Sequence, residues 1–168
     1  MARRPLPVAP AAVLLGSADE VEAQFYEALR QGDIERLMAL WADDDGIVCV
    51  HPGGGRCIGA PAIRASFEAI FGSGAGGAAG GRAGIPVQPG QVHRLEQIGM
   101  ALHHLVERIR LPAAEPARAG RQAQTAYVLA SNLYLKTAQG WRLAAHHASP
   151  GTAQEPAALV AEAPSTLH

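Results

Sequence analysis

The chain has 168 residues, of which 48% are hydrophobic and 17% are charged, a composition that fits one globular domain with its own core. Its net charge is -1, from 14 basic and 15 acidic residues without long runs of one sign. This balance excludes the basic surface of a nucleic-acid-binding protein. No apolar run reaches the roughly 20 residues that span a bilayer, so we expect a soluble protein with no membrane partner.

Four segments lack the pattern of a folded element. Residues 1–17 carry two arginines and an apolar stretch broken by prolines, which predicts a flexible extension; an export signal is the alternative to a cytoplasmic protein. Residues 72–84 are nearly all Gly and Ala and predict a loop. Residues 112–121 predict a hairpin loop, and residues 151–168 predict a loose tail. The folded domain is therefore expected over residues 18–150.

Three helices are predicted in the first half of the domain. Asp19 can cap a helix whose apolar residues recur every four positions, and Gly32 ends it. Asp33 then caps a second, short helix that carries Ile34 and Leu37 on one face. Pro61 lies in the first turn of the third helix, whose apolar stripe includes Ile63, Phe67, Ile70 and Phe71.

Strands fill the rest of the domain. Residues 47–51 and 56–58 predict a hairpin around a Pro-Gly-Gly-Gly turn. Longer strands are predicted at residues 87–97, 100–111, 125–136 and 141–147. Five of the seven histidines lie within or at the ends of the strands at residues 47–51, 100–111 and 141–147, namely His51, His103, His104, His146 and His147. Imidazole donates, accepts or binds metal near neutral pH, so the sheet is a candidate chemical surface.

Four motifs in this order resemble the nuclear transport factor 2-like superfamily, and in particular its SnoaL-like members. They read FYEALRQGDIERLMALWADD, HPGG, G-x-x-AIRASFEAIF and QGWRLAAHHASP, and they span residues 20–150. The resemblance implies an α+β fold in which a curved antiparallel sheet wraps around three N-terminal helices to form a cone. It implies little about function, because this scaffold carries enzymes, binding modules and association domains.

The ketosteroid isomerase branch of this superfamily suggests two catalytic positions. Its general-base Asp precedes a Pro at the end of the first strand, where this chain has His51 before Pro52. Its protonated Asp, which donates to the oxyanion, matches Asn132. Its Tyr on the first helix falls on Phe25, with Tyr26 one residue off, so the resemblance leaves that donor incomplete.

Strand parity, applied to the same cone, predicts which side chains face the cavity. The predicted inward set is Leu102, His104, Val106, Leu143, Ala145, His147 and Ser149. His103 and His146 then face outward toward a partner subunit, and Glu96 and Glu107 also point outward. The predicted ligand-binding residues are Trp41, His104, Tyr134 and His147. The non-catalytic alternatives are that His51 caps its turn and that Asn132 satisfies backbone groups.

Three functions remain open at this point. The first is an enclosed pocket that binds a small, largely apolar molecule. The second is an isomerase, cyclase or dehydratase that acts on a carbonyl compound with His51 as general base. The third is a dimeric association module, because this fold commonly dimerises through the outer face of its sheet. No cofactor is expected; a metal held by His51, His104 and His147 is a further alternative that their spacing does not support.

Overall fold

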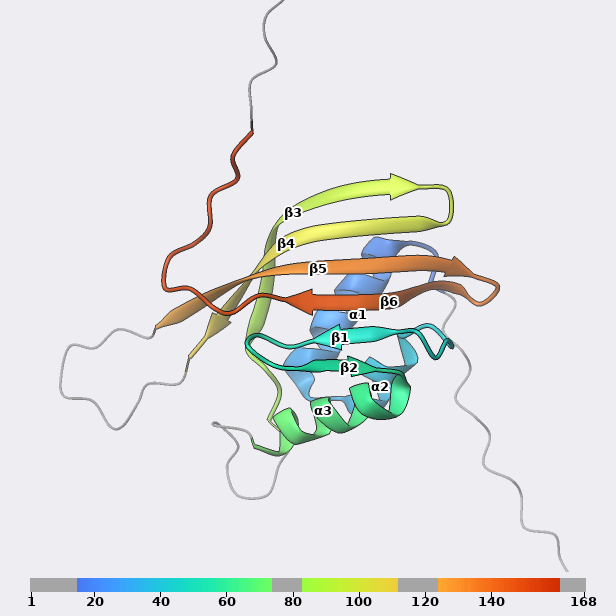
Figure 1. The fold of residues 1–168 in the computed structure, drawn as a ribbon, viewed down its shortest axis with the longest axis horizontal. Coiled ribbons are helices and arrows are strands. Elements are labelled where there is room, and N and C mark those ends of the chain that lie inside the picture. The colour runs from blue at the N-terminus through green and yellow to red at the C-terminus, as the bar shows by residue number, and fades with distance from the viewer. Residues whose placement is uncertain (1–14, 74–82, 112–123, 161–168) are drawn as a thin grey trace, which may run out of the picture.

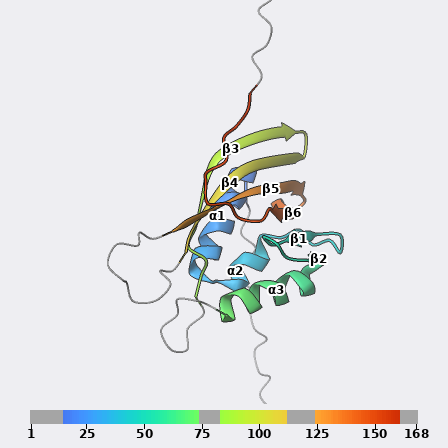
Figure 2. The same cartoon turned by 60° about the vertical axis from the view of Figure 1, so that its left-hand side comes forward.

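A computed structural model describes residues 15–73, 83–111 and 124–160 of the chain. Three helices lie on one side of a six-stranded sheet, which leaves the other side of the sheet open (Figure 1, Figure 2). We call the side that meets the helices the inner face and the open side the outer face. The predicted extension and the two predicted loops lie largely outside the described residues.

The first helix, α1 (Ala18–Gln31), has the predicted end but a different cap. The Ser17 hydroxyl accepts a hydrogen bond from the Glu20 amide, 3.1 Å, so the predicted cap Asp19 instead lies in the first turn. Gly32 ends the helix at φ 65°, a left-handed conformation that favours glycine. Val21 and Phe25 of this helix are fully buried against the sheet.

The other two helices follow the sequence prediction. Asp33 caps α2 (Ile34–Ala39) by accepting from the Arg36 amide, 3.0 Å. Pro61 lies in the first turn of α3 (Ala60–Gly72), where the missing amide hydrogen costs nothing. Among the described residues, no helix combines the length and the apolar character needed to cross a bilayer.

The sheet has the order β2-β1-β6-β5-β4-β3. Its strands are β1 (Val48–Val50), β2 (Arg56–Ile58), β3 (Val87–Gln97), β4 (Met100–Arg110), β5 (Thr125–Thr137) and β6 (Gly140–Ala148). All neighbours are antiparallel except β1 and β6, which are parallel. The predicted α+β architecture is therefore confirmed, with the correction that the sheet is mixed.

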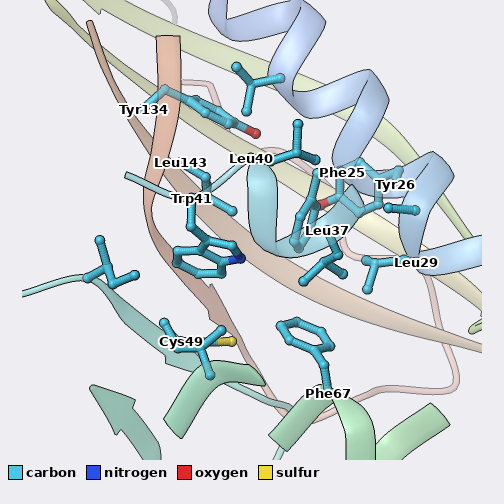
Figure 3. Close-up of a cluster of buried hydrophobic side chains, with 14 of the residues drawn as sticks. Phe25, Tyr26, Leu29, Leu37, Leu40, Trp41, Cys49, Phe67, Tyr134 and Leu143 are labelled. Atoms are coloured by element: carbon cyan, nitrogen blue, oxygen red, sulfur yellow. The ribbon is translucent and has the colours of Figure 1, made fainter. Parts of the chain in front are cut away.

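Aromatic side chains fill much of the space between the helices and the inner face (Figure 3). Phe67 of α3 packs edge-on against Phe25 of α1, with 6.4 Å between ring centroids, and lies 6.0 Å from Phe71. Trp41 follows α2 and bridges to Leu143 of β6. These contacts join all three helices to the sheet in one core.

A β-bulge in β6 reverses the predicted parity of the last strand. Tyr134 is opposite Leu143, and Leu133 is opposite Ala145, so Ala144 has no partner on β5. A single inserted residue moves every later side chain to the other face. His146 therefore points inward and is 4% exposed, whereas His147 is exposed on the outer face. The prediction that His147 lines the cavity was wrong.

The predicted parity of β4 was also wrong. His103 and Glu107 are 0% and 4% exposed on the inner face, and His104 is exposed on the outer face. The pattern of apolar residues could not identify the inner face, because the outer face also carries leucines, including Leu102.

Candidate functional site

Seven polar side chains lie together between α1 and the inner face, and none is more than 5% exposed. We call this group the buried polar row: Glu22, Tyr26, His103, Glu107, Asn132, Tyr134 and His146. Helix α1 contributes two residues one turn apart. Strands β4, β5 and β6 contribute residues whose side chains point from the inner face toward the helix. Buried polar groups are costly unless they are paired, so their hydrogen bonds define what the row can do.

Four of these residues form a ring. His146 Nδ1 donates to Asn132 Oδ1, 2.7 Å, and Asn132 Nδ2 donates to the Tyr26 hydroxyl, 3.2 Å. The Tyr26 hydroxyl then donates to Glu107 Oε1, 2.8 Å. His146 Nε2 lies 4.0 Å from the same carboxylate oxygen, so proximity and not a hydrogen bond completes the ring. The three hydrogen bonds run in one direction, from His146 through Asn132 and Tyr26 to Glu107, so Glu107 is the final acceptor.

Burial sets the charges of this ring. Removal from water raises the pKa of Glu107 to about 7, although the hydrogen bond from Tyr26 opposes the rise. Removal from water, with the neighbouring His51 and His147, lowers the pKa of His146 to about 3. Burial also raises the pKa of Tyr26 well above its usual value. Near neutral pH, Glu107 is therefore the group in the ring that gains and loses a proton.

The other three residues of the row form a second cluster beside the ring. Glu22 Oε2 is 2.8 Å from His103 Nδ1 and accepts from the Tyr134 hydroxyl, 3.2 Å. His103 Nε2 is buried and has no hydrogen-bond partner among the described residues. The carboxylate thus orients the imidazole and leaves its second nitrogen without a partner, as in the pairs that hold a catalytic base.

His51 stands at the end of β1, half-buried against α3. Its Nε2 lies 2.9 Å from the Ser66 hydroxyl, which itself donates to the Ile63 carbonyl, 2.7 Å. A hydroxyl has one hydrogen, so His51 Nε2 donates to Ser66 and only Nδ1 can accept a proton. Burial lowers the pKa of His51, which keeps its imidazole neutral. The Gly54 amide bonds the His51 carbonyl, so the turn does not use the imidazole.

The alternative of a three-histidine metal set does not assemble, because His51 is on the inner face and His104 and His147 are on the outer face. Asp19, Glu22 and His103 do bring one ligand atom each within 4.8 Å of one another. Asp19, however, is paired with Arg94 at 2.8 Å, and Glu22 already accepts two hydrogen bonds. These groups are better explained by their partners within the chain than by a metal.

A cavity of about 870 Å³ lies at the other end of the domain, between α2, the loop after it and the β5–β6 hairpin. Met38, Leu40 and Trp41 supply apolar walls, and Asp43 and Asp44 are among its charged residues. Trp41, labelled in Figure 3, is 5% exposed, and its indole nitrogen has no partner among the described residues. No residue of the buried polar row lines this cavity.

The structure therefore brings together two of the six residues predicted for the site, Asn132 and Tyr134. Trp41 borders the separate cavity, and His51 lies outside the ring. Sequence reasoning missed five members of the row, which are Glu22, Tyr26, His103, Glu107 and His146. One available signal was the position of Glu22 on the apolar face of α1, beside Val21 and one turn before Tyr26.

The outer face carries an apolar row that crosses all six strands. Its members are cross-strand neighbours in the order Ile58, Val48, Ala145, Leu133, Leu102 and Leu95. Ile58 and Leu95 at its two ends are 54% and 50% exposed. Leu129 and Leu135 of β5, on the same face, are 38% and 37% exposed. Contiguous exposed apolar surface of this kind marks an interaction site in soluble proteins.

Comparison with protein families gives a match to the SnoaL-like domain over residues 19–153. The chain belongs to the SnoaL-like domain family. A comparison with curated proteins finds no match.

Solved structures similar to this SnoaL-like domain are described as enzymes in some cases and as association domains in others. A proposed calcium/calmodulin-dependent protein kinase type II association domain from Thiobacillus denitrificans is 31% identical, with 82% of this chain and 97% of that chain covered and a TM-score of 0.64. A proposed NTF2-like dehydratase from Streptomyces avermitilis is 28% identical, with 77% and 90% covered and a TM-score of 0.62. A CaMKII hub from S. rosetta, at 20% identity, 88% and 100% coverage and a TM-score of 0.56, shares the fold.

Proposed function

We propose that this SnoaL-like domain is a homo-oligomeric association module that binds a second copy of itself through the outer face of its sheet. The observation that carries the proposal is the apolar row, which continues without a polar interruption from β2 to β3. The similarity to a protein described as an association domain supports the same conclusion.

The size of the outer face fits this role. The four long strands run about 30 Å each, the three-residue strands β1 and β2 run about 10 Å each, and each strand occupies a width of about 4.8 Å. The face therefore offers roughly 700 Å², close to the roughly 800 Å² that each partner buries in a standard interface. An interface of this kind depends most on its central residues, and Ala145 and Leu133 occupy the middle of the row.

Light scattering after size exclusion tests the proposal. The parent chain should elute as a dimer or larger assembly, and Leu133→Asp should weaken association at least tenfold by placing a charge in an apolar contact. Leu159→Asp is the matched control, because Leu159 is 98% exposed and lies outside the sheet. A parent chain that is monomeric at high micromolar concentration would contradict the proposal, as would a Leu133→Asp variant that associates as tightly as the control.

Proton transfer on a small carbonyl or hydroxy compound is the second candidate, and the ring around Glu107 favours it. A carboxyl group with a pKa of about 7 gains and loses protons at neutral pH, and the phenol of Tyr26 is a hydrogen-bond donor beside it. This places the acid-base role on Glu107 rather than on His51. It ranks second because the ring is closed and a substrate in the cavity beside Trp41 would not touch it.

Turnover of a panel of enones and β-hydroxy carbonyl compounds, followed by ultraviolet absorbance, tests this candidate. Glu107→Gln should abolish any turnover that the parent chain shows, and Ser66→Ala should leave most of it, because Ser66 touches His51 and not the ring. Full activity in Glu107→Gln, with activity lost in His51→Ala, would return the role of base to His51.

A further inference from the structure

Two histidines face each other on the outer face, two residues along the strands from Leu95 and Leu102. His93 of β3 is directly opposite His104 of β4, and both are exposed. Their neighbours His103 and Arg94 point to the helix side, where they contact Glu22 and Asp19. The alternation along both strands therefore places both imidazoles on the outer face. We call them the histidine pair.

The spacing of the pair suits shared coordination. Residues directly opposite in an antiparallel sheet have Cβ atoms about 4.5–5.5 Å apart, so two imidazoles there can reach one ion. The next position across the sheet is Ser131 of β5, whose small side chain leaves room beside His104. Beyond it, His147 is opposite Ser131 on β6, two strands away from His104. Imidazole nitrogens are good ligands for zinc, nickel and copper, and poor ones for magnesium and calcium.

We propose that the histidine pair binds a divalent transition-metal ion on the outer face. Among the described residues, no third histidine, cysteine or carboxylate joins the pair in a compact set, because the one such group of three lies on the inner face. The pair therefore fills two of the four positions that zinc prefers and leaves two open. Because the pair borders the apolar row, a second copy seated on that row can supply the remaining ligands, a step that rests on the proposed self-association.

Calorimetric titration with zinc chloride tests the metal site directly. The parent chain should bind zinc with micromolar affinity, and His104→Gln and His93→Gln should each weaken binding about tenfold or more. His51→Gln is the matched control, since it removes a histidine on the inner face, away from the pair and from the proposed contact, and it should keep the affinity of the parent. Zinc binding that is unchanged in His104→Gln, or no binding below millimolar zinc in the parent, would overturn the site.

Light scattering with and without zinc separates this inference from the proposed function. Zinc should raise the average mass of the parent at a fixed protein concentration and should have no effect on His104→Gln. A chain that associates equally with and without zinc keeps its association role and loses the metal bridge. A chain that binds zinc through the pair but stays monomeric keeps the metal site and loses the association role.

Discussion

Glu107→Gln should make the protein more stable at pH 8 than its parent, although it removes a buried hydrogen-bonded carboxyl group. The pKa of Glu107 rises from its usual 4.5 to about 7 on folding, because burial disfavours the charged form. That rise corresponds to about 3 kcal/mol of unfolding free energy. Below pH 4.5 the side chain is protonated in both states and the full stability is present. As the pH rises through 7, the folded state must lose the proton and that stability is lost.

Glutamine has the shape of the protonated carboxyl group, and its Oε1 can still accept from Tyr26. The difference in unfolding free energy, Glu107→Gln minus parent, should therefore be about 3 kcal/mol higher at pH 8 than at pH 4, which means that the variant gains stability relative to the parent. Urea unfolding at both pH values, at one fixed protein concentration, measures the difference. The exposed strand residue Glu96 gives the control Glu96→Gln, which should follow the parent. An equal loss of stability at both pH values in Glu107→Gln would refute the reasoning.

The pH profile of the parent follows from Glu107 and His146 together. The pKa of His146 falls from 6.5 to about 3 on folding, so its contribution to stability is present above 6.5 and is lost as the pH falls toward 3. Between pH 4.5 and 6.5 the folded pair holds one proton, on Glu107, and the unfolded pair also holds one, on His146. These two residues should therefore leave the unfolding free energy independent of pH in that range. In Glu107→Gln the unfolding free energy should rise with pH over the same range, because only His146 then contributes.

Three further predictions concern the core and the turns. Burial raises the pKa of the Cys49 thiol to about 12, so a thiol reagent at pH 8 should label the partly exposed Cys57 first, and faster labelling of Cys49 would contradict its burial. Gly140→Ala should lower the melting temperature, because Gly140 has φ 93° and a Cβ there would lie 2.6 Å from the Leu15 carbonyl oxygen. Phe67→Ala should cost about 3–5 kcal/mol in urea unfolding, and a loss below about 1 kcal/mol would mean that the aromatic core collapses around the gap.

The helices and the order of strands could be predicted from local signals. Asp33, Gly32 and Pro61 each act through the backbone within one turn of the helix that they start or end, so their effect is visible in the sequence. Such signals locate a helix end only to within about two residues. Asp19 was predicted as the cap, but Ser17, two residues earlier and also a good cap, takes that position.

The inner and outer faces could not be predicted with the same success. Parity is a two-state choice that depends on the absence of bulges, and the extra residue Ala144 has no mark in the sequence. On β4 the usual guide failed because Leu102 belongs to an apolar row on the outer face. The same two errors hid Glu107 and His146, whereas the prediction of His51 as base came from the resemblance at His51 and Pro52.

The bulge at Ala144 also bears on how this strand can change in evolution. Residues 145–148 alternate between the protein interior, through His146, and the proposed contact with another copy, through Ala145 and His147. Deletion of Ala144 would remove the bulge, make Leu143 and Ala145 consecutive in the ladder, and leave His146 opposite Asn132. Insertion of one residue after Ala144 would instead place Ala145 on the inner face and His146 on the outer face, so this strand tolerates a shorter length better than a longer one.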